Sequence, residues 1–322
     1  MPELVVNTPE RILLAAPRGY CAGVDRAVQT VEQALDLYGA PVYVRKEIVH
    51  NKHVVAQLRE RGVVFVDQET EVPEGATVVF SAHGVAPSVH ANAEQRGLKT
   101  IDATCPLVTK VHVEAKKFAA EGYTIVLVGH AGHEEVEGTM GEAPDRIVLV
   151  ETVEDVEALD IADPDRVAYI SQTTLSVDET RAIIDRLREK FPAIVGPRTD
   201  DICYATTNRQ AAVKQLAAAC DMVLVIGSEN SSNSQRLVEV TRELGTDSYL
   251  IDHEGQVREE WLEGKRVVGI TSGASAPEEL VTRLVAYFRA RGTQDVQELE
   301  VVQEDVRFML PKTIRQALAG PA

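Results

Sequence analysis

Residues 17–25 read PRGYCAGVD and place Cys21 between two glycines. The apolar run 12–16 precedes this stretch, and apolar residues recur at helical spacing after it, so Cys21 lies where a strand gives way to a helix. Cys105 lies 84 residues after Cys21 and is followed by the same helical spacing, and Cys203 lies 98 residues after Cys105 and is followed by a less regular helical pattern. The stretch therefore predicts a structural unit that occurs three times, each time opened by a cysteine.

Each of these units continues with three strand-like segments in the same order. The first is an apolar run, the second ends at an acidic residue, and the third ends at a polar turn. These features are the runs 41–44, 125–128 and 222–226, the acids Asp67, Glu151 and Asp252, and the turns 81–84 (SAHG), 171–174 (SQTT) and 271–275 (TSGAS). Helices that alternate with strands predict an α/β fold with parallel sheets. We therefore expect three pseudo-equivalent small α/β domains.

The domain boundaries are expected to follow the cysteines. The predicted segments are an N-terminal strand with the first cysteine, which joins the third domain (1–21), three α/β domains (22–104, 105–202 and 203–290) and a C-terminal tail (291–322). Ligand-binding groups gather outside the carboxyl ends of parallel strands. If the three domains pack as a trefoil around a pseudo-threefold axis, their cysteines and polar turns meet in one central site.

Length and composition limit the class of protein. The 322 residues, of which 44% are hydrophobic, suffice for a large core, and no apolar run approaches the roughly 20 residues of a membrane span. The start of the chain lacks the basic and cleavage signals of a secretory peptide, so we expect a cytoplasmic protein that does not bind membranes. A net charge of −17 argues against a nucleic-acid partner.

The recurring cysteines favour a metal site over plain packing. Each precedes a helix, whose N-terminus stabilises a thiolate, the form that ligates metal. Three thiolates can hold zinc with water as the fourth ligand, or three corners of a 4Fe-4S cluster with the fourth iron open, and the spacing decides between neither. Cys220 lies on the apolar stripe of a helix and is interpreted as a core residue.

Polar loops at matching positions of the repeat indicate an anion site. The loops 81–85, 129–138, 230–234 and 271–277 are rich in glycine, hydroxyl, amide and imidazole groups, which can cradle a phosphate. The residues in register are His50, His83, His133, Ser231, Ser232 and Asn233. Neither a Walker sequence nor a Rossmann glycine motif is present, so a nucleotide is not expected.

One acidic residue and the remaining histidines complete the candidate list. Glu135 lies two residues after His133 in a glycine-flanked loop, and a carboxyl group held near a metal can move protons. Glu134 and Glu137 are weaker candidates for that role. The other histidines, at positions 53, 90, 112, 130 and 253, are interpreted as surface or supporting residues.

The motifs together resemble one known family. They are RGYCAGVDRA, HN at 50 and 51, SAHGV, DATCPLVTKVH, GHAGHEEVEGTMG, QTTLSVDET, DICYATTNRQ, GSENSSNS and SGASAPEEL. In this order, from about Ile12 to Leu280, they resemble the 4-hydroxy-3-methylbut-2-enyl diphosphate reductases, the IspH or LytB family.

The resemblance implies a trefoil of α/β domains around an iron-sulfur cluster. It implies a 4Fe-4S cluster with Cys21, Cys105 and Cys203 as ligands and a fourth iron open to substrate or water. It implies the reductive removal of an allylic hydroxyl, the last step of the methylerythritol phosphate route to isopentenyl and dimethylallyl diphosphates, with ferredoxin or flavodoxin as electron donor. The implied diphosphate-binding residues are His50, His83, His133, Ser231, Ser232, Asn233 and Ser275, and the implied proton-relay residues are Glu135 and Thr173.

Two other functions stay open at this point. A zinc hydrolase with three thiolate ligands predicts a colourless protein that is active in air. An iron-sulfur redox sensor or electron carrier predicts a cluster without affinity for a diphosphate. The charged segment 295–315 has no predicted packing partner.

Overall fold

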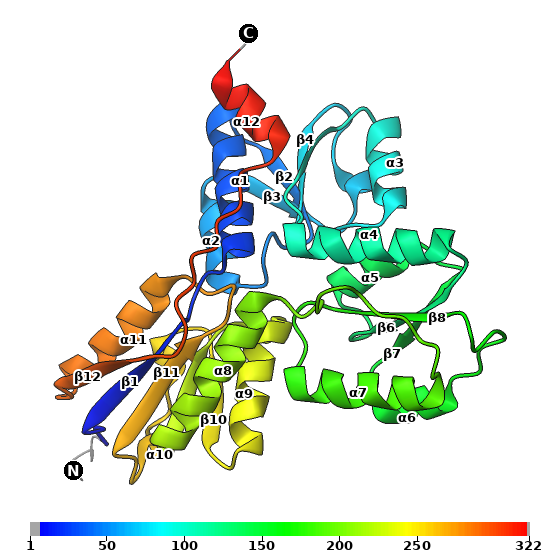
Figure 1. Cartoon of the computed structure of the whole chain (residues 1–322). Coiled ribbons are helices and arrows are strands. Elements are labelled where there is room, and N and C mark those ends of the chain that lie inside the picture. The colour runs from blue at the N-terminus through cyan, green and yellow to red at the C-terminus, as the bar shows by residue number, and fades with distance from the viewer. Residues whose placement is uncertain (1–6, 321–322) are drawn as a thin grey trace. The chain divides into compact units, whose positions relative to one another are not determined.

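The computed structural model describes residues 7–320, and this part of the chain forms two compact units. The first unit comprises residues 7–21, 50–54 and 204–306, and the second comprises 22–49, 55–203 and 307–320. The described residues contain three β-sheets, and every strand pair in them is parallel. The predicted α/β class with parallel sheets is therefore confirmed (Figure 1).

The first unit is built on a five-stranded sheet in the order β10-β9-β11-β1-β12. Its strands are β1 (Arg11–Ala16), β9 (Met222–Ile226), β10 (Asp247–Ile251), β11 (Val267–Ser272) and β12 (Asp295–Glu300). Its helices are α8 (Tyr204–Ala219), α9 (Ser232–Glu243), α10 (Glu259–Leu262), α11 (Glu278–Ala290) and the 3-10 turn η2 (Glu254–Gln256). The N-terminal strand β1 thus lies beside β11.

Alternate residues of these strands supply two separate cores. On one face Leu224, Ile226 and Ile270 pack with Leu284 and Phe288 of α11. On the other face Val223 and Val225 pack with helices α8 and α9. Side chains of a strand point alternately to the two faces, so a strand that is apolar at every position must be covered on both.

The second unit contains a four-stranded sheet, β3-β2-β4-β5, and a three-stranded sheet, β7-β6-β8. The strands are β2 (Val42–Arg45), β3 (Val63–Val66), β4 (Thr77–Phe80), β5 (Lys99–Asp102), β6 (Thr124–Val128), β7 (Ile147–Val150) and β8 (Val167–Ser171). The helices are α1 (Ala22–Tyr38), α2 (Lys52–Glu60, whose first residues belong to the first unit), η1 (Glu69–Glu71), α3 (Pro87–Gln95), α4 (Pro106–Ala120), α5 (Glu134–Met140), α6 (Val153–Ala158), α7 (Val177–Lys190) and α12 (Lys312–Ala319).

The three sheets repeat one strand order. In chain order, the second strand of each repeat lies at one side of the first strand and the third lies at the other: β3-β2-β4, β7-β6-β8 and β10-β9-β11. The registers align the carboxyl ends, since Ile226 pairs with both Ile251 and Ser272. The polar turn after each third strand therefore opens at the carboxyl end of its sheet, where the repeat predicted ligand-binding groups.

The C-terminal segment adds elements that the sequence did not predict. Strand β12 pairs with β1 over Arg11–Ala16 and Asp295–Glu300, and helix α12 contacts α1, with Ile314 fully buried. β12 lies at the sheet edge and is mostly exposed, so its sequence DVQELE is polar and resembles a charged tail. Among residues 7–320, no helix is long and apolar enough to cross a membrane.

Candidate active site

The three repeated cysteines share one local geometry. Each is followed directly by a helix, α1, α4 or α8. The backbone N–H of each donates to the carbonyl oxygen of the second residue after a third strand: Cys21 to Ala274 (3.3 Å), Cys105 to Ala82 (3.0 Å) and Cys203 to Thr173 (3.1 Å). One hydrogen bond thus fixes each cysteine to a polar turn, and it recurs at equivalent positions in all three repeats.

The donor set of these cysteines fits a metal cluster. All four cysteines of the chain are free thiols, and Cys21, Cys105 and Cys203 are partly exposed at helix N-termini, which stabilise thiolates. Burial, aided by the charge of Asp221, raises the pKa of Cys220 to about 12, and its side chain packs against the apolar core. Three thiols therefore suit an iron-sulfur or zinc ligand role, and the fourth is a core residue.

Glu135 and Thr173 form a buried pair beside Cys203. The backbone N–H of Thr173 donates to Glu135 Oε1 at 2.6 Å, and Thr173 Oγ1 donates to Glu135 Oε2 at 3.0 Å. Both side chains are nearly inaccessible to solvent. Because the carbonyl of Thr173 accepts from Cys203, this residue connects the carboxylate to the cysteine through three hydrogen bonds.

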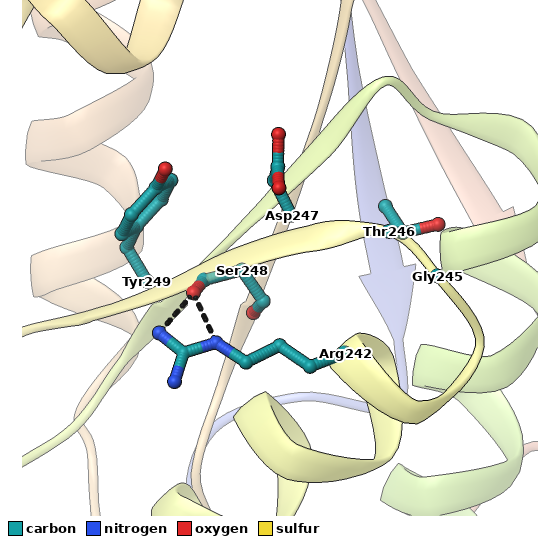
Figure 2. Close-up of a pocket in the computed structure, with 6 residues that line it drawn as sticks. All are labelled: Arg242, Gly245, Thr246, Asp247, Ser248 and Tyr249. Carbon is teal, nitrogen blue, oxygen red and sulfur yellow. Dashed lines mark hydrogen bonds between the residues drawn. The ribbon is translucent and has the colours of Figure 1, made fainter.

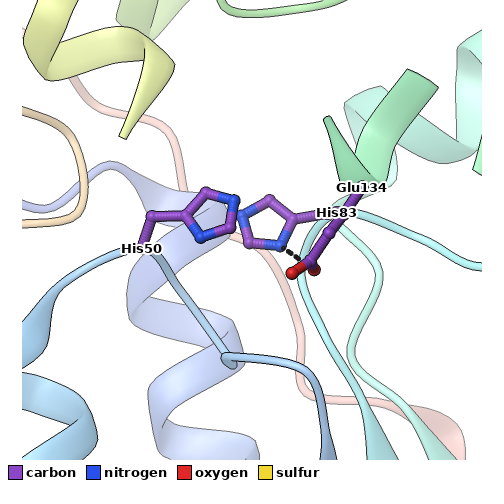
Figure 3. A group of neighbouring side chains, drawn as sticks. All are labelled: His50, His83 and Glu134. Atoms are coloured by element: carbon purple, nitrogen blue, oxygen red, sulfur yellow. Dashed lines mark hydrogen bonds and ion pairs between the residues drawn. The ribbon is translucent and has the colours of Figure 1, made fainter. Parts of the chain in front are cut away.

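His83 is paired with an acidic residue that the sequence ranked low. Its Nδ1 lies 3.1 Å from Oε2 of Glu134 (Figure 3). The same nitrogen lies 3.3 Å from the hydroxyl of Ser81. A neutral imidazole whose Nδ1 donates to a carboxylate keeps Nε2 as an acceptor, and a protonated ring would donate from both nitrogens. Glu134 thereby sets the orientation and the tautomer of His83. The sequence signal for it was only its place beside His133 and Glu135.

His133 caps the helix that carries both acidic residues. Its Nδ1 accepts a hydrogen bond from the backbone N–H of Glu135 at 3.1 Å, at the N-terminus of α5. The neutral ring therefore holds its proton on Nε2. The rings of His83 and His133 meet edge to face with centroids 5.8 Å apart. The second unit thus brings together Cys105, His83, His133, Glu135, Thr173 and Cys203.

A buried polar cluster occupies the carboxyl end of the sheet in the first unit. It consists of His50, Ser231, Asn233 and Ser275 and is called the serine-asparagine cluster below. Ser275 Oγ donates to the carbonyl of His50 at 2.9 Å and lies 3.3 Å from Ser231 Oγ. Asn233 Oδ1 accepts from the backbone N–H of Ala274 at 2.8 Å. Ser232 is the first residue of α9 and is half-buried.

Two glycines allow the N-terminus of α9 to approach this cluster. Ser234 lies in the first turn of α9. A Cβ atom added at Gly227 would lie 2.2 Å from its Oγ, and one added at Gly273 would lie 2.0 Å from it. The backbone of both turns therefore packs directly against the helix. An N-terminus rich in hydroxyl and amide donors favours an anion. The cluster contains no lysine or arginine, so neutral donors and the helix dipole would supply the attraction.

The surface pocket shown in Figure 2 lies elsewhere in the first unit. Arg242 and residues 245–249 line it, with a volume of about 320 Å³, where β10 begins and hence at the opposite end of that strand from the serine-asparagine cluster. The guanidinium of Arg242 donates to the carbonyl of Ser248 at 2.7 and 3.0 Å. The pocket is thus distinct from the residues predicted to bind substrate.

The second unit also contains a buried charged cluster, made of Asp201, Lys110 and Glu114, that was not predicted from the sequence. The buried carboxylate of Asp201 accepts from the backbone N–H of Ser171 at 2.9 Å and from Lys110 Nζ at 2.9 Å. Glu114 lies beside it, and burial together with the neighbouring Asp201 raises the pKa of Glu114 to about 7, against the opposing charge of Lys110. At a pH between 4.5 and about 7, Glu114 therefore keeps a proton in the folded protein that it would release in an unfolded chain.

We expect this group to make stability fall as the pH rises. The pKa of Glu114 lies near 4.5 in an unfolded chain and about 7 in the folded one, so folding takes up a proton between these values. Its destabilising effect is absent below pH 4.5 and complete above pH 7. The Tm of the wild type should fall between pH 5 and 8 by more than that of Glu114→Gln. Thermal unfolding at several pH values measures the difference.

The matched control is Glu121→Gln, which removes a half-exposed carboxyl group from the end of the same helix. It should keep the pH profile of the wild type. A constant difference in Tm between wild type and Glu114→Gln across this range would contradict the raised pKa.

Comparison with known proteins identifies the family. The family model described as LytB protein matches residues 12–289. The chain belongs to the LytB family. It is 57% identical to a 4-hydroxy-3-methylbut-2-enyl diphosphate reductase of Leifsonia xyli subsp. xyli, over 99% of this chain and 95% of the relative. It is 60% identical to the Acidothermus cellulolyticus protein of that name, over 99% of this chain and 94% of the relative.

Two solved structures agree with the LytB assignment. The structure of the E-1-hydroxy-2-methyl-but-2-enyl-4-diphosphate reductase from Plasmodium falciparum matches with a TM-score of 0.94 and 36% identity, covering 97% of this chain and 98% of that one. A second structure, described as the terminal enzyme of the non-mevalonate pathway, matches with a TM-score of 0.63 and 36% identity, covering 87% and 99%. The predicted resemblance to the LytB family is therefore confirmed.

Proposed function

We propose that this protein reduces 4-hydroxy-3-methylbut-2-enyl diphosphate to isopentenyl and dimethylallyl diphosphates. The reaction adds two electrons and two protons to the allylic alcohol, breaks its C–O bond and releases water. The observation that carries the proposal is the hydrogen bond from each cysteine N–H to a polar turn, repeated three times at equivalent positions. LytB relatives over the full chain bear this reductase name, which supports the substrate class.

We infer that Cys21, Cys105 and Cys203 ligate a 4Fe-4S cluster whose fourth iron has no protein thiolate. Their partial exposure and their helix N-termini support this role, and the raised pKa of Cys220 supports its exclusion. Such a cluster, when bound, would supply electrons one at a time to the reaction. The cysteines hold it, and the surrounding turns set where each thiolate points.

Glu135 and Thr173 are the proposed proton-transfer residues. The carboxylate is buried and accepts two hydrogen bonds from Thr173, so its position is fixed before substrate arrives. When the carboxyl group is protonated, it can give that proton to a departing hydroxyl, and the Thr173 hydroxyl can pass one between them. The anchoring of Cys203 to Thr173 supports a place for this pair beside the metal site.

The diphosphate is proposed to bind through neutral donors and imidazoles. These are His50, Ser231, Ser232, Asn233 and Ser275 of the first unit and His83 and His133 of the second. The serine-asparagine cluster and the N-terminus of α9 support this role, because oriented dipoles stabilise an anion without a clustered positive charge.

The Asn233→Asp variant tests the diphosphate site with little change in shape. Aspartate keeps an oxygen to accept from the N–H of Ala274, but it replaces an amide donor by a negative charge. We expect the Kd for the substrate to rise by about 100-fold or more, as repulsion replaces a hydrogen bond in a buried setting. Calorimetry or a spectral titration measures the Kd.

Gln235→Glu is the control for this variant. It adds the same charge on an exposed position of α9 and should leave the Kd within about twofold. Wild-type affinity in Asn233→Asp would remove Asn233 from the proposed diphosphate site.

Three further features complete the proposal. Each sheet with its helices is proposed as one domain, with boundaries near 22–104, 105–202 and 203–290, in a trefoil that encloses the cluster. The electron donor is proposed to be a ferredoxin or flavodoxin. The protein is proposed to act in the cytoplasm.

Anaerobic turnover with a reduced viologen dye tests the reaction. The dye should be oxidised by two electrons for each substrate consumed, and both isomeric diphosphates should appear. Release of phosphate without oxidation of the dye would favour a zinc hydrolase. Oxidation of the dye by a cluster protein that leaves the substrate unchanged would favour a redox carrier.

A further inference from the structure

Each cysteine-led helix carries a cation in its second turn. Arg26 lies five residues after Cys21, Lys110 five after Cys105 and Arg209 six after Cys203. The side chain of each donates to backbone carbonyls that precede a different cysteine. Arg26 contacts the chain before Cys105, Lys110 the chain before Cys203, and Arg209 the chain before Cys21.

Arg209 shows the arrangement in its most buried form. Its side chain is inaccessible to solvent, and it donates to the carbonyl of Gly19 at 2.7 and 3.1 Å and of Tyr20 at 3.4 Å. The carboxylate of Glu304 lies 3.0 Å away and supplies the counter-charge. A buried guanidinium needs both a counter-charge and partners for its donors, and here it has both.

The segment 19–21, whose carbonyls Arg209 contacts, also donates hydrogen bonds to residues 272 and 274 at the end of β11 and in the turn after it. Gly19 has a φ of +68°, and its N–H donates to the carbonyl of Ser272 at 3.4 Å. The N–H of Cys21 donates to Ala274 at 3.3 Å. The carbonyl and amide groups before Cys21 are therefore held from opposite directions, by Arg209 and by the turn after β11. These contacts restrain the backbone at Cys21 and hence the direction in which its side chain leaves the chain.

Arg26 makes the equivalent contacts in the second unit, with the segment before Cys105. Arg26 Nη1 donates to the carbonyls of Ala103 at 2.9 Å and Thr104 at 3.0 Å, the two residues before Cys105, while Nε donates to the carbonyl of Met309 at 2.8 Å. Burial lowers the pKa of Arg26, and the negative charge of the neighbouring Asp102 acts against this.

Lys110 holds the segment before Cys203 in the same manner. Its ammonium group donates to the carbonyls of Thr199 at 2.6 Å and Asp200 at 3.1 Å, and to the carboxylate of Asp201 at 2.9 Å. An ammonium has three donors, and each has an acceptor here. These contacts lie two to four residues before Cys203, whereas the two arginines contact the residues one and two positions before their cysteines.

We propose that Arg26, Lys110 and Arg209 are positioning residues that fix the three cysteines in cyclic order. The helix after Cys21 fixes Cys105, the helix after Cys105 fixes Cys203, and the helix after Cys203 fixes Cys21. Two neighbouring carbonyls that accept from one cation restrict the backbone before each cysteine, so the backbone that carries the thiol is held in place before any metal binds. The role toward a cluster rests on the proposed function, whereas the cyclic fixing of the backbone does not.

Amide hydrogen exchange on the full-length protein tests the cyclic order. Arg209→Lys should speed exchange at residues 18–22, Arg26→Lys at 102–105 and Lys110→Met at 199–203, each by about tenfold, the effect of losing roughly one net hydrogen bond. Arg26 and Arg209 reach their partners through separate guanidinium nitrogens, and the single ammonium nitrogen of a lysine at either position cannot reproduce all of these contacts. Glu304→Gln provides a second test of Arg209, since it keeps the arginine and removes its counter-charge.

The control is Lys117→Met, which removes an exposed cation from the same helix as Lys110 and should leave exchange unchanged. Faster exchange confined to the substituted helix, uniformly faster exchange over the whole unit, or no change would each overturn the proposal. The cyclic order predicts that exchange becomes faster in the segment before the next cysteine. A general loss of stability would instead make exchange faster over the whole unit.

The rate of iron loss to a chelator provides the second readout. The Arg209→Lys, Glu304→Gln, Arg26→Lys and Lys110→Met variants should lose iron several-fold faster than wild type and Lys117→Met. An unchanged rate in variants with locally faster exchange would overturn the role toward a cluster. Wild-type protein that binds no iron would instead overturn the proposed function, and the exchange pattern would still decide the positioning role.

Discussion

Replacing any one of Cys21, Cys105 and Cys203 with alanine is expected to abolish both cluster retention and turnover. A 4Fe-4S cluster held by three thiolates has no protein ligand to spare, so the loss of one leaves two irons without protein thiolates. The iron content should fall from about four per chain to below one, and dye-linked turnover should reach background. Iron analysis of anaerobically purified protein and the viologen assay measure both.

The fourth cysteine provides the matched control for these variants. Cys220 packs in the core, and burial raises its pKa to about 12, so it is a poor source of thiolate near neutral pH. Cys220→Ala should keep its iron and its turnover, with only a modest fall in Tm. If Cys220→Ala lost its iron while Cys21→Ala retained a full complement, the assignment of ligands would be wrong.

The substitution Glu135→Gln is expected to reduce turnover by about 10² to 10⁴ while the substrate still binds. Glutamine has the shape of the carboxylate and can still accept the hydrogen bond from the N–H of Thr173, so the turn that anchors Cys203 should persist. What it cannot do is carry an exchangeable acidic proton. The expected result is therefore a large fall in kcat, with little change in iron content or substrate Kd.

Glu137→Gln is the control on the same helix, where the side chain is exposed. It should retain the kcat of the wild type. If Glu135→Gln retained full turnover, the residue would have no role in proton transfer. A rise in Kd without a change in kcat would make it a binding residue instead.

The strands and the polar turns could be predicted because burial leaves a strong pattern in the sequence. Strand Met222–Ile226 is buried and apolar at every position, and strand Val167–Ser171 is buried throughout and apolar up to Ser171, where its polar turn begins. The repeat then fixes which turn follows which strand. The edge strand Asp295–Glu300 is half-exposed and has no such pattern, so it could not be predicted in the same way.

The candidate site was predictable only in part, for a related reason. The cysteines, His83 and His133 stand at repeated positions, so the register of the repeat identifies them, and Glu135 follows His133 in the same loop. Contacts between distant parts of the chain leave no periodic signal. Arg209 and Glu304 are 95 residues apart, and Arg209 reaches Gly19 across 190, so their pairing becomes visible only in the fold. The partner of His83, Glu134, could be ranked above its neighbours only once the geometry was known.

The most direct test of the account is a count of iron and acid-labile sulfide, with a visible absorption spectrum, on anaerobically purified protein before and after adding 4-hydroxy-3-methylbut-2-enyl diphosphate. We expect about four irons and four sulfides per chain and a spectral change when the diphosphate binds. Zinc in place of iron, or a cluster whose spectrum ignores the diphosphate, would contradict the proposed reductase.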